Sequence, residues 1–382
     1  MKLTVDSSKL SRVCDAAAKT IPSKVAMPIL ECFLIEAHSE RDSITITASN
    51  NEDMVHYLLE DSVSIEQGGG ERVCISSSQL LGILKALPQQ PIIITITDKS
   101  ATIEWGNGQG RAEIPVQSAD EFPSAQQPTQ YETAMHVLEL RDIMNDVAFC
   151  AADDALRPIM NGVFFDYSGE QLVCAASDGH RLAKKVVMDV KAHQPIHSFV
   201  LPRRCSRVVD SFIGEVRRAN TEALVHLTWD ERKVSFNAEG HCVTFVLTNG
   251  RYPNVDSVIP KNNPISVDVN REALIGALRR TMVFGNKVTS LIKLQFETNK
   301  LTVSADNMDF STSSSEHIPA QMMGAETFTI GVKGSYLLDI LTHFYTEDVH
   351  IEGTDHSRAL VLRGIDDEDD RLMLLMPMML ND

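Results

Sequence analysis

This 382-residue chain lacks the sequence features of secreted, membrane-spanning and zinc-binding proteins. Its seven cysteines stand singly, and none forms the Cys-X-X-Cys pair that is typical of zinc sites. No run of about 18 apolar residues occurs, so no transmembrane helix is expected. The start, MKLTVDSSKL, has no long apolar stretch after its lysine and does not resemble a signal peptide. We predict a cytoplasmic protein with buried, reduced thiols, no metal and no cofactor.

Positive charge is also scarce, because 35 Lys and Arg residues face 52 Asp and Glu residues and the formal net charge is -17. This balance argues against general adhesion to nucleic acid. The basic residues nevertheless gather on predicted helices, and a local positive surface would suit sequence-independent contact with phosphates. For each residue alone, the alternative is an ordinary solvated helix face. The candidate DNA-facing residues are Lys9, Arg12, Lys19, Lys24, Arg203, Arg204, Arg207, Arg271, Arg279 and Arg280.

The chain does contain one pattern that occurs three times. Each unit begins with a polar-capped helix, continues into β-rich sequence, offers a second helix and closes on alternating strands. Equivalent helices begin roughly 125–135 residues apart, which is the size of one domain. We therefore predict three domains, at 1–127, 128–254 and 255–382. The predicted helices are Ser7 to Thr20, Ser76 to Leu87, His136 to Cys150, Pro202 to Gly214, Asn270 to Phe284 and Lys333 to Phe344.

The strand patterns are short, rich in β-branched residues and separated by tight turns, so they predict antiparallel hairpins and an α+β fold. The clearest strands are Ile44 to Ala48, Pro91 to Thr97, Leu224 to Thr228, Lys233 to Asn237 and Leu291 to Glu297. The turns between strands are predicted at Asp98-Lys99, Ser168-Gly169-Glu170, Asp230-Glu231 and Thr298-Asn299-Lys300. The segments 121–133 and 251–264 are predicted to be linkers, and each contains an aromatic residue followed by proline.

The most specific short motif is Ser-Asp-Gly-His-Arg-Leu at 177–182. Asp178 and His180 could serve acid-base catalysis, but no nucleophile or metal-ligand pair accompanies them. A structural turn at Asp178-Gly179 and a recognition loop are the other two interpretations. The glycine-rich segment 106–110 lies between strand patterns and opens no helix, so it is predicted to be a hairpin loop and not a dinucleotide site.

The C-terminal end is dense in methionine, with Met373, Met376, Met378 and Met379 close together. One interpretation is a buried edge strand, and Pro377 suits the edge or the end of a strand. The other is an adaptable apolar surface for varied partners, because methionine is flexible and polarizable.

These residues resemble the bacterial β sliding clamps, the DNA polymerase III β subunits, over the whole length of the chain. The segments that carry the resemblance are MKLTV at the start, Met27 to Leu30, Arg157 to Gly162, Ser177 to Ala183, Val200 to Arg203, Gly250 to Pro253, Ile259-Pro260 and Met376 to Met378.

The resemblance implies three clamp domains, each with two helices and antiparallel sheets, in a head-to-tail homodimer that closes into a ring. Duplex DNA would pass through the ring without sequence preference. The ring would tether the replicative polymerase and other replication and repair proteins, and a clamp loader would open it. No active site and no membrane are implied. The rival interpretations are a hydrolase that uses Asp178 and His180, and a DNA-binding module that grips by charge alone.

The resemblance also implies a hydrophobic pocket for a short partner peptide. Its residues would be Arg157, Met160, Ser177, Gly179, His180, Arg181, Leu182, Pro253, Val258, Leu374, Met376, Pro377, Met378 and Met379. The dimer interface would pair the strand around Arg111 and Ile114 with the helix end at Val283 and Phe284.

The chain departs from the family pattern at four positions. Pro158 and Ile159 stand where aromatic residues are usual, Asp154 where a neutral polar residue is common, and Met379 where a basic residue is common. We therefore expect altered partner preferences and an altered contact at Asp154.

Overall fold

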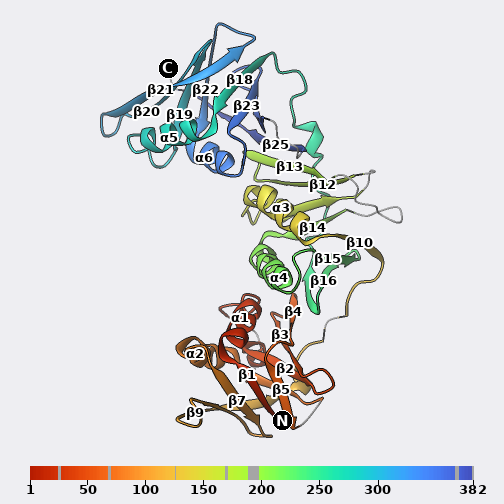
Figure 1. Cartoon of the computed structure of the whole chain (residues 1–382). Coiled ribbons are helices and arrows are strands. Elements are labelled where there is room, and N and C mark those ends of the chain that lie inside the picture. Colours follow the sequence, from red (N-terminus) through yellow and green to blue (C-terminus); the bar gives the residue numbers. More distant parts are fainter. Residues whose placement is uncertain are drawn as a thin grey trace. The chain divides into compact units, whose positions relative to one another are not determined.

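The computed structural model describes residues 1–24, 27–67, 70–124, 126–167, 171–187, 198–365 and 370–380. These residues form two compact units. The first comprises Met1–Arg141 and Arg204–Leu247, and the second comprises the described parts of 142–203 together with residues 248–380. Each unit is built on one 13-stranded antiparallel sheet (Figure 1).

In the first unit the strands follow the order β10-β15-β16-β17-β4-β3-β2-β6-β9-β8-β7-β1-β5. The strands are β1 Lys2–Asp6, β2 Cys32–His38, β3 Ser43–Ser49, β4 Met54–Leu59, β5 Val63–Gln67, β6 Arg72–Ser76, β7 Pro91–Ile96, β8 Ser100–Trp105, β9 Gly110–Ser118, β10 Tyr131–His136, β15 Leu224–Trp229, β16 Lys233–Ala238 and β17 His241–Val246. The helices are α1 Ser7–Ala18, α2 Ser77–Ala86 and α4 Ser206–Ala219. Helices α1 and α2 pack against each other and against the sheet (Figure 1).

In the second unit the order is β14-β11-β12-β13-β25-β24-β23-β18-β21-β20-β19-β22-β26. The strands are β11 Gly162–Asp166, β12 Leu172–Ser177, β13 Arg181–Val187, β14 Phe199–Pro202, β18 Ile265–Asn270, β19 Leu291–Glu297, β20 Lys300–Asn307, β21 Thr312–Met323, β22 Thr327–Lys333, β23 Asp348–Gly353, β24 Leu360–Gly364, β25 Asp370–Leu375 and β26 Pro377–Met378. The helices are α5 Arg271–Thr281 and α6 Gly334–Thr342, which contact each other. Helix α3, Val137–Val147, contains the boundary between the units at Arg141.

All six predicted helices are confirmed, and side-chain caps explain where α1 and α5 begin. The Asp6 carboxylate accepts hydrogen bonds from the Ser8 and Lys9 amides at the start of α1, and the Asn270 side chain accepts one from the Ala273 amide at the start of α5. The predicted bounds of the fourth helix were wrong. A 3-10 turn precedes it, and it continues past Gly214 to Ala219, because a single glycine weakens a helix without ending it.

The predicted strands are confirmed, as are the hairpin loop at 106–110 and the turns at Asp98, Asp230 and Thr298. The turn predicted at 168–170 lies outside the described residues. The second predicted linker, 251–264, contains no strand, and its one helical turn is the 3-10 turn Val255–Ser257. The first, 121–133, opens on the last residue of the 3-10 turn Ala119–Glu121. Its predicted end was wrong, because residues 131–133 already belong to β10.

Strands pair across the boundaries between the sequence repeats. In the first unit β17 pairs with β4, with Val243 opposite Val55. In the second unit β13 pairs with β25, from Arg181 opposite Leu375 to Val186 opposite Asp370. The two halves of the middle repeat therefore join different sheets, and this explains why three repeats in sequence pack as two units.

The edge strand that one interpretation predicted for the methionine-rich end is present at Pro377–Met378 but not at Met373. Strand β25 has β13 on one side and β24 on the other, and Met373 is buried. The edge position predicted around Met373 was wrong, because β25 gains its second neighbour, β13, from a distant repeat. Pro377 does lie at a sheet edge, in the short terminal strand β26 beside β22.

All seven cysteines are free and buried, as predicted. No described helix is long and apolar enough to cross a membrane. Among the residues that the structure describes, no group of three or more His, Cys, Asp or Glu side chains could hold a metal ion.

Candidate functional site

An open cavity of about 520 Å³ lies in the second unit, on the face of the sheet that carries Leu182 and Leu374. The segment 252–260 and the loop between β23 and β24 form its other walls. Its lining residues are Met160, Ser177, Gly179, Arg181, Leu182, Tyr252, Pro253, Asn254, Val255, Ser257, Val258, Ile259, Pro260, Ser357, Arg358, Ala359, Leu374 and Met376. Most of these side chains are apolar, and an apolar cavity with a few polar groups is typical of a ligand site.

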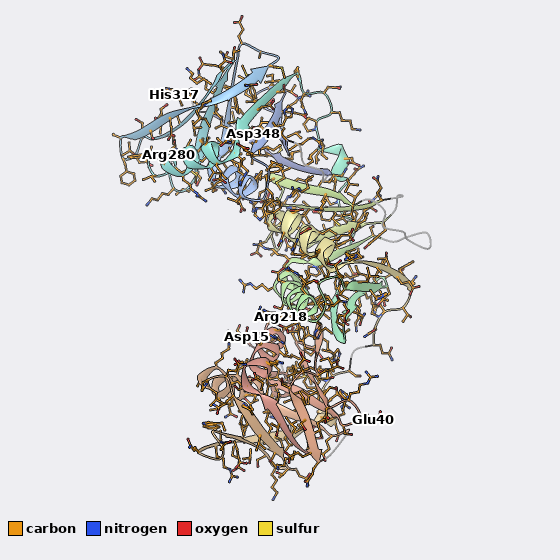
Figure 2. All side chains as sticks on the ribbon, in the orientation of Figure 1. Asp15, Glu40, Arg218, Arg280, His317 and Asp348 are labelled. Atoms are coloured by element: carbon orange, nitrogen blue, oxygen red, sulfur yellow. The ribbon has the colours of Figure 1, made fainter. Side chains whose placement is uncertain are left out.

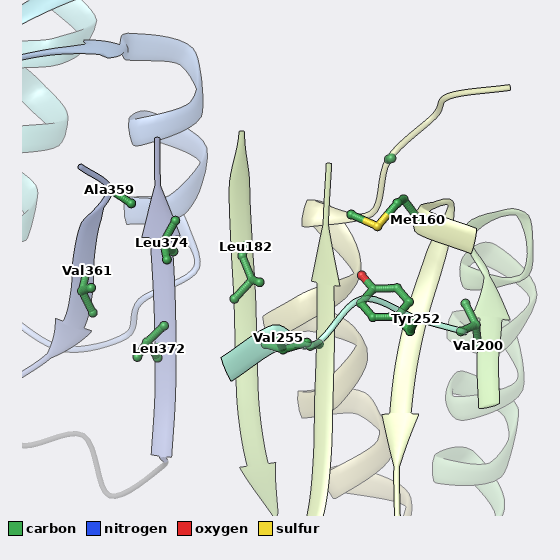
Figure 3. Close-up of a cluster of buried hydrophobic side chains, with 11 residues drawn as sticks. Met160, Leu182, Val200, Tyr252, Val255, Ala359, Val361, Leu372 and Leu374 are labelled. Carbon is green, nitrogen blue, oxygen red and sulfur yellow. The ribbon is translucent and has the colours of Figure 1, made fainter. Parts of the chain in front are cut away.

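A buried hydrophobic cluster supports the cavity from below (Figure 3). Leu182, Leu374 and Val361 come from three neighbouring strands, while Val255 comes from the covering segment. The ring of Tyr252 stacks on that of Phe164, with centroids 4.7 Å apart. This packing fixes the cavity floor before any ligand arrives, which lowers the entropic cost of binding.

The Ser-Asp-Gly-His-Arg-Leu motif forms the turn from β12 to β13, so the turn interpretation is confirmed. One oxygen of Asp178 accepts hydrogen bonds from the amides of His180 at 2.8 Å and Arg181 at 2.9 Å, and the other accepts from Arg181 Nε at 3.2 Å. Gly179 has a φ of +89°, which favours glycine. Since the Asp178 carboxylate organises this turn, the geometry supports a recognition loop better than an acid-base pair with the His180 ring.

Arg181 forms one wall of the cavity and anchors it to α6. Its guanidinium donates to Asp339 and to the Phe149 carbonyl, the latter at 2.9 Å, and it lies over the ring of Tyr336 at 4.5 Å. Burial lowers the pKa of Arg181, but the hydrogen bond and charge of Asp339 outweigh this effect and raise the pKa above its usual range. The wall is therefore rigid and carries a permanent positive charge.

The structure brings most of the predicted pocket residues together. The cavity wall contains Met160, Ser177, Gly179, Arg181, Leu182, Pro253, Val258, Leu374 and Met376. Arg157 lies beside the motif turn, where its guanidinium donates to the Asp178 carbonyl at 3.4 Å.

The remaining predicted pocket residues lie outside the wall. The carbonyl of His180 accepts from the Met376 amide at 2.8 Å. Pro377 and Met378 pair with β22, and the side chain of Met379 is 91% exposed.

Sequence reasoning missed several wall residues, among them Tyr252, Val255 and Ala359. The aromatic-proline pair at 252–253 and the Ile259-Pro260 pair were local signals for the covering segment. The loop at 357–359 has no comparable signal, because only the folded sheet brings it near.

Three of the four departures from the family pattern have clear structural roles. Pro158 begins the 3-10 turn Pro158–Met160 that leads Met160 into the cavity wall, and Ile159 packs against the hydrophobic cluster. The carboxylate of Asp154 lies 2.9 Å from Arg157 Nε. A backbone hydrogen bond from Leu156, together with Arg157, lowers the pKa of Asp154.

Many of the candidate DNA-facing residues bind neighbouring groups of the protein. In the first unit Arg12 lies 3.0 Å from Glu215, Lys19 donates to Ser211 at 2.6 Å, Arg204 lies 3.1 Å from Asp53 and Lys9 lies 3.8 Å from Asp61. In the second unit Arg203 donates to the Ala151 carbonyl at 3.3 Å, Arg271 donates to the Thr346 carbonyl at 2.9 Å, and Arg280, labelled in Figure 2, lies 2.5 Å from Glu316.

Lys24, Arg207 and Arg279 are exposed, and none of them makes an ion pair with a described residue. Half of the ten candidates, Lys9, Arg12, Arg204, Arg271 and Arg280, have a carboxylate within ion-pair distance. The charges of Lys24, Arg207 and Arg279 stay exposed to solvent.

Two strands leave part of an edge open among the described residues. Strand β9 pairs with β8 over 110–115, but it reaches β6 only from Val116 onward. Strand β21 pairs with β20 over 312–319, but it reaches β18 only from Ala320 onward. Unpaired main-chain groups on such edges are templates for pairing with another chain.

The four predicted interface residues lie at these open edges. Arg111 is exposed on β9, whereas the Ile114 side chain is 4% exposed and contributes only main chain to the edge. Val283 and Phe284 are 69% and 46% exposed. The carbonyl of Phe284 accepts from the Thr312 hydroxyl at 2.9 Å, which places this apolar pair beside the start of β21.

Three family models match the chain in succession. They describe the N-terminal domain of the DNA polymerase III beta subunit at residues 1–126, the central domain at 134–254 and the C-terminal domain at 256–379. A beta sliding clamp of Pseudomonas aeruginosa is 26% identical, with 100% of each chain covered. A beta sliding clamp of Bacillus subtilis is 23% identical, with 96% of this chain and 97% of the relative covered.

Solved structures have the same fold. The DNA polymerase III subunit beta of Pseudomonas aeruginosa matches with a TM-score of 0.89 at 22% identity, with 100% of each chain covered. A sliding clamp from Bartonella birtlesii, bound to griselimycin, matches with a TM-score of 0.90 at 22% identity and the same coverage.

Proposed function

This chain belongs to the family of DNA polymerase III beta subunits, and we propose that it acts as a sliding clamp. In this role it encircles duplex DNA in the bacterial cytoplasm and tethers the replicative polymerase and other replication and repair proteins to it. The observation that carries the proposal is the succession of three family matches, which together span residues 1–379 with short gaps. We place the three clamp domains at 1–127, 128–254 and 255–382.

A ring requires a second copy of the chain, and the open edges of β9 and β21 support a head-to-tail pairing. Each edge presents main-chain donors and acceptors, and Val283 and Phe284 add exposed apolar surface beside β21. Pairing β9 of one copy with β21 of the other would form hydrogen bonds between the unpaired main-chain groups. A dimer would contain two such interfaces, and together they would close the ring.

The cavity beside the motif turn is the proposed docking site for partner peptides. Its apolar wall would receive an apolar side chain, and Arg181 and the turn at Gly179 would orient the peptide main chain. Met376 lines the opening and is 40% exposed, and its flexible side chain suits several partners. Griselimycin is bound in two of the related clamp structures, and we propose that it also binds this cavity.

The proposed clamp has no catalytic role and holds DNA by topology. An acidic chain in which half of the candidate cations are paired with carboxylates would bind phosphates weakly, which allows sliding. Escape then requires opening of the ring, for which a clamp loader must supply the energy.

Retention on DNA tests the function. The dimer is loaded onto nicked circular DNA by a bacterial clamp loader, and retention at high salt is measured before and after the circle is cut. We expect retention on the circle and rapid loss from the linear form. Equal loss from both forms would indicate binding by charge alone, because charge contacts weaken with salt whatever the DNA topology.

A further inference from the structure

A second cavity, of about 280 Å³, lies further along the same sheet face. In the first cavity wall Leu182 is opposite Leu374 across β13 and β25. Two residues further on, Lys184 is opposite Leu372 in the wall of the second. Strand residues two apart point to the same face, so one sheet face forms the floor of both cavities, and Figure 3 shows Leu372 and Leu374 on the same strand. Ile259 lines both cavities, so they are adjacent, and together they are called the groove.

The second cavity differs from the first in its charge. Three cations line it, Lys184, Lys261 and Arg363, together with the anion Asp256, and Arg363 Nε lies 3.9 Å from Glu352 outside the lining. The chain as a whole has a formal net charge of -17. A positive cavity in such an acidic body attracts anionic groups selectively.

The existing ion pair leaves room for a further carboxylate. Lys184 Nζ lies 2.7 Å from Asp256, but the Asp256 side chain is 67% exposed, and exposed pairs are weak and easily exchanged. Lys261 is exposed on the covering segment and makes no ion pair with a described residue. Its ammonium group is therefore available to an incoming anion.

We propose that the second cavity binds an acidic side chain of the partner peptide whose apolar side chain occupies the first cavity. The proposal rests on the proposed docking function and names a chemical requirement for its partners. Since an extended chain rises about 3.3 Å per residue, the two compartments correspond to peptide positions about two residues apart. The groove thus selects an Asp or Glu about two residues from the apolar anchor.

Peptide display on the full-length dimer tests this requirement. A random linear peptide library is selected on the wild type, on Val258→Asp and on the double variant Lys261→Gln with Arg363→Gln. We expect wild-type binders to combine an apolar anchor with an acidic residue about two positions away, and the double variant to keep the anchor and lose the acidic residue. Wild-type binders with the anchor but without acidic enrichment would overturn this proposal alone. If no peptide depends on Val258, peptide docking itself fails, and this proposal with it.

Calorimetry then measures the contact with one selected peptide and its Asp→Asn form. We expect about tenfold weaker binding of the Asn form, because a charge-assisted contact is lost. The affinity difference should shrink at high salt and disappear in Lys261→Gln. A charge swap, Lys261→Glu with a Lys-containing peptide, should restore part of the binding. Lys293→Gln is the matched control, because it removes one exposed charge from β19 of the same unit. An equal loss in the control, or no loss with the Asn peptide, would contradict the proposal.

Discussion

The ammonium nitrogen of Lys185 lies 2.7 Å from a carboxylate oxygen of Asp146 in the interior of the second unit. The other carboxylate oxygen accepts from Arg371 Nη1 at 3.1 Å. Lys185 and Arg371 face each other where β13 of the middle repeat pairs with β25 of the third. All three side chains are nearly inaccessible to solvent. One helix carboxylate thus balances two buried cations at the junction between repeats.

Replacing Asp146 by alanine should lower the free energy of unfolding by about 3–5 kcal/mol, because two buried cations would each lose a buried carboxylate contact. Urea unfolding followed by circular dichroism measures the change. Lys300→Ala, which breaks the partly exposed pair with Glu297, should cost no more than about 1 kcal/mol. Equal effects of the two substitutions would contradict the role assigned to the buried carboxylate.

Stability of the first unit should fall with acid because of His241. Burial, and next the charge of Arg12, lower the pKa of His241 to about 4, against the opposite effect of Glu239. Its Nδ1 accepts from the Leu58 amide at 3.2 Å, so the folded state needs the neutral ring. As the pH falls from about 6.5 to about 4, only the unfolded chain takes up this proton. The free energy of unfolding should therefore drop by about 3 kcal/mol over that range.

His241→Gln isolates this effect, since glutamine does not titrate. Thermal unfolding from pH 7 to pH 4 should show a flatter decline than in the wild type. The matched variant His226→Gln changes an exposed histidine of β15 and should follow the wild-type curve. Parallel curves for His241→Gln and the wild type would rule out His241 as the source.

Val258→Asp should weaken peptide binding at least tenfold, because it puts a charge into the apolar cavity wall. Val258 is 54% exposed, so the substitution should leave the melting temperature nearly unchanged. Calorimetry with a selected peptide reports the loss. If Val258→Asp binds every peptide selected on the wild type with unchanged affinity, this wall is not part of the docking site.

Phe284→Asp should convert the proposed dimer to monomers, because it places a charge in the proposed apolar contact beside β21. Sedimentation equilibrium measures the dissociation constant, which we expect to rise at least a hundredfold, or by about 3 kcal/mol. Val258→Asp serves as the control, since it adds the same charge elsewhere in the second unit and should stay dimeric. A Phe284→Asp dimer of wild-type affinity would remove this residue from the interface.

Local sequence was sufficient for the helices and for most strands. The Asp6 and Asn270 caps, the apolar spacing and the turn at Asp178-Gly179 depend only on nearby residues, so they could be interpreted without a fold. The position of β25 could not be predicted, because its neighbour β13 lies nearly two hundred residues earlier and pairing energy gives no local signal.

The residues of the candidate site were likewise only partly predictable from the sequence. The motif turn and the Tyr252-Pro253 segment were recognisable in the sequence, whereas Ala359 and the basic compartment at Lys261 were not. Their proximity depends on three strands and one covering segment that only the folded unit brings together.

The sequence by itself therefore determined the threefold repeat, the α+β class, the caps and turns, and the family to which the chain belongs. The tertiary structure alone decided which halves of the middle repeat join which sheet, which cations are paired and which side chains share a cavity. The physical reason is that periodicity and capping act over a few residues, while strand pairing, burial and ion pairing depend on residues that are distant in sequence.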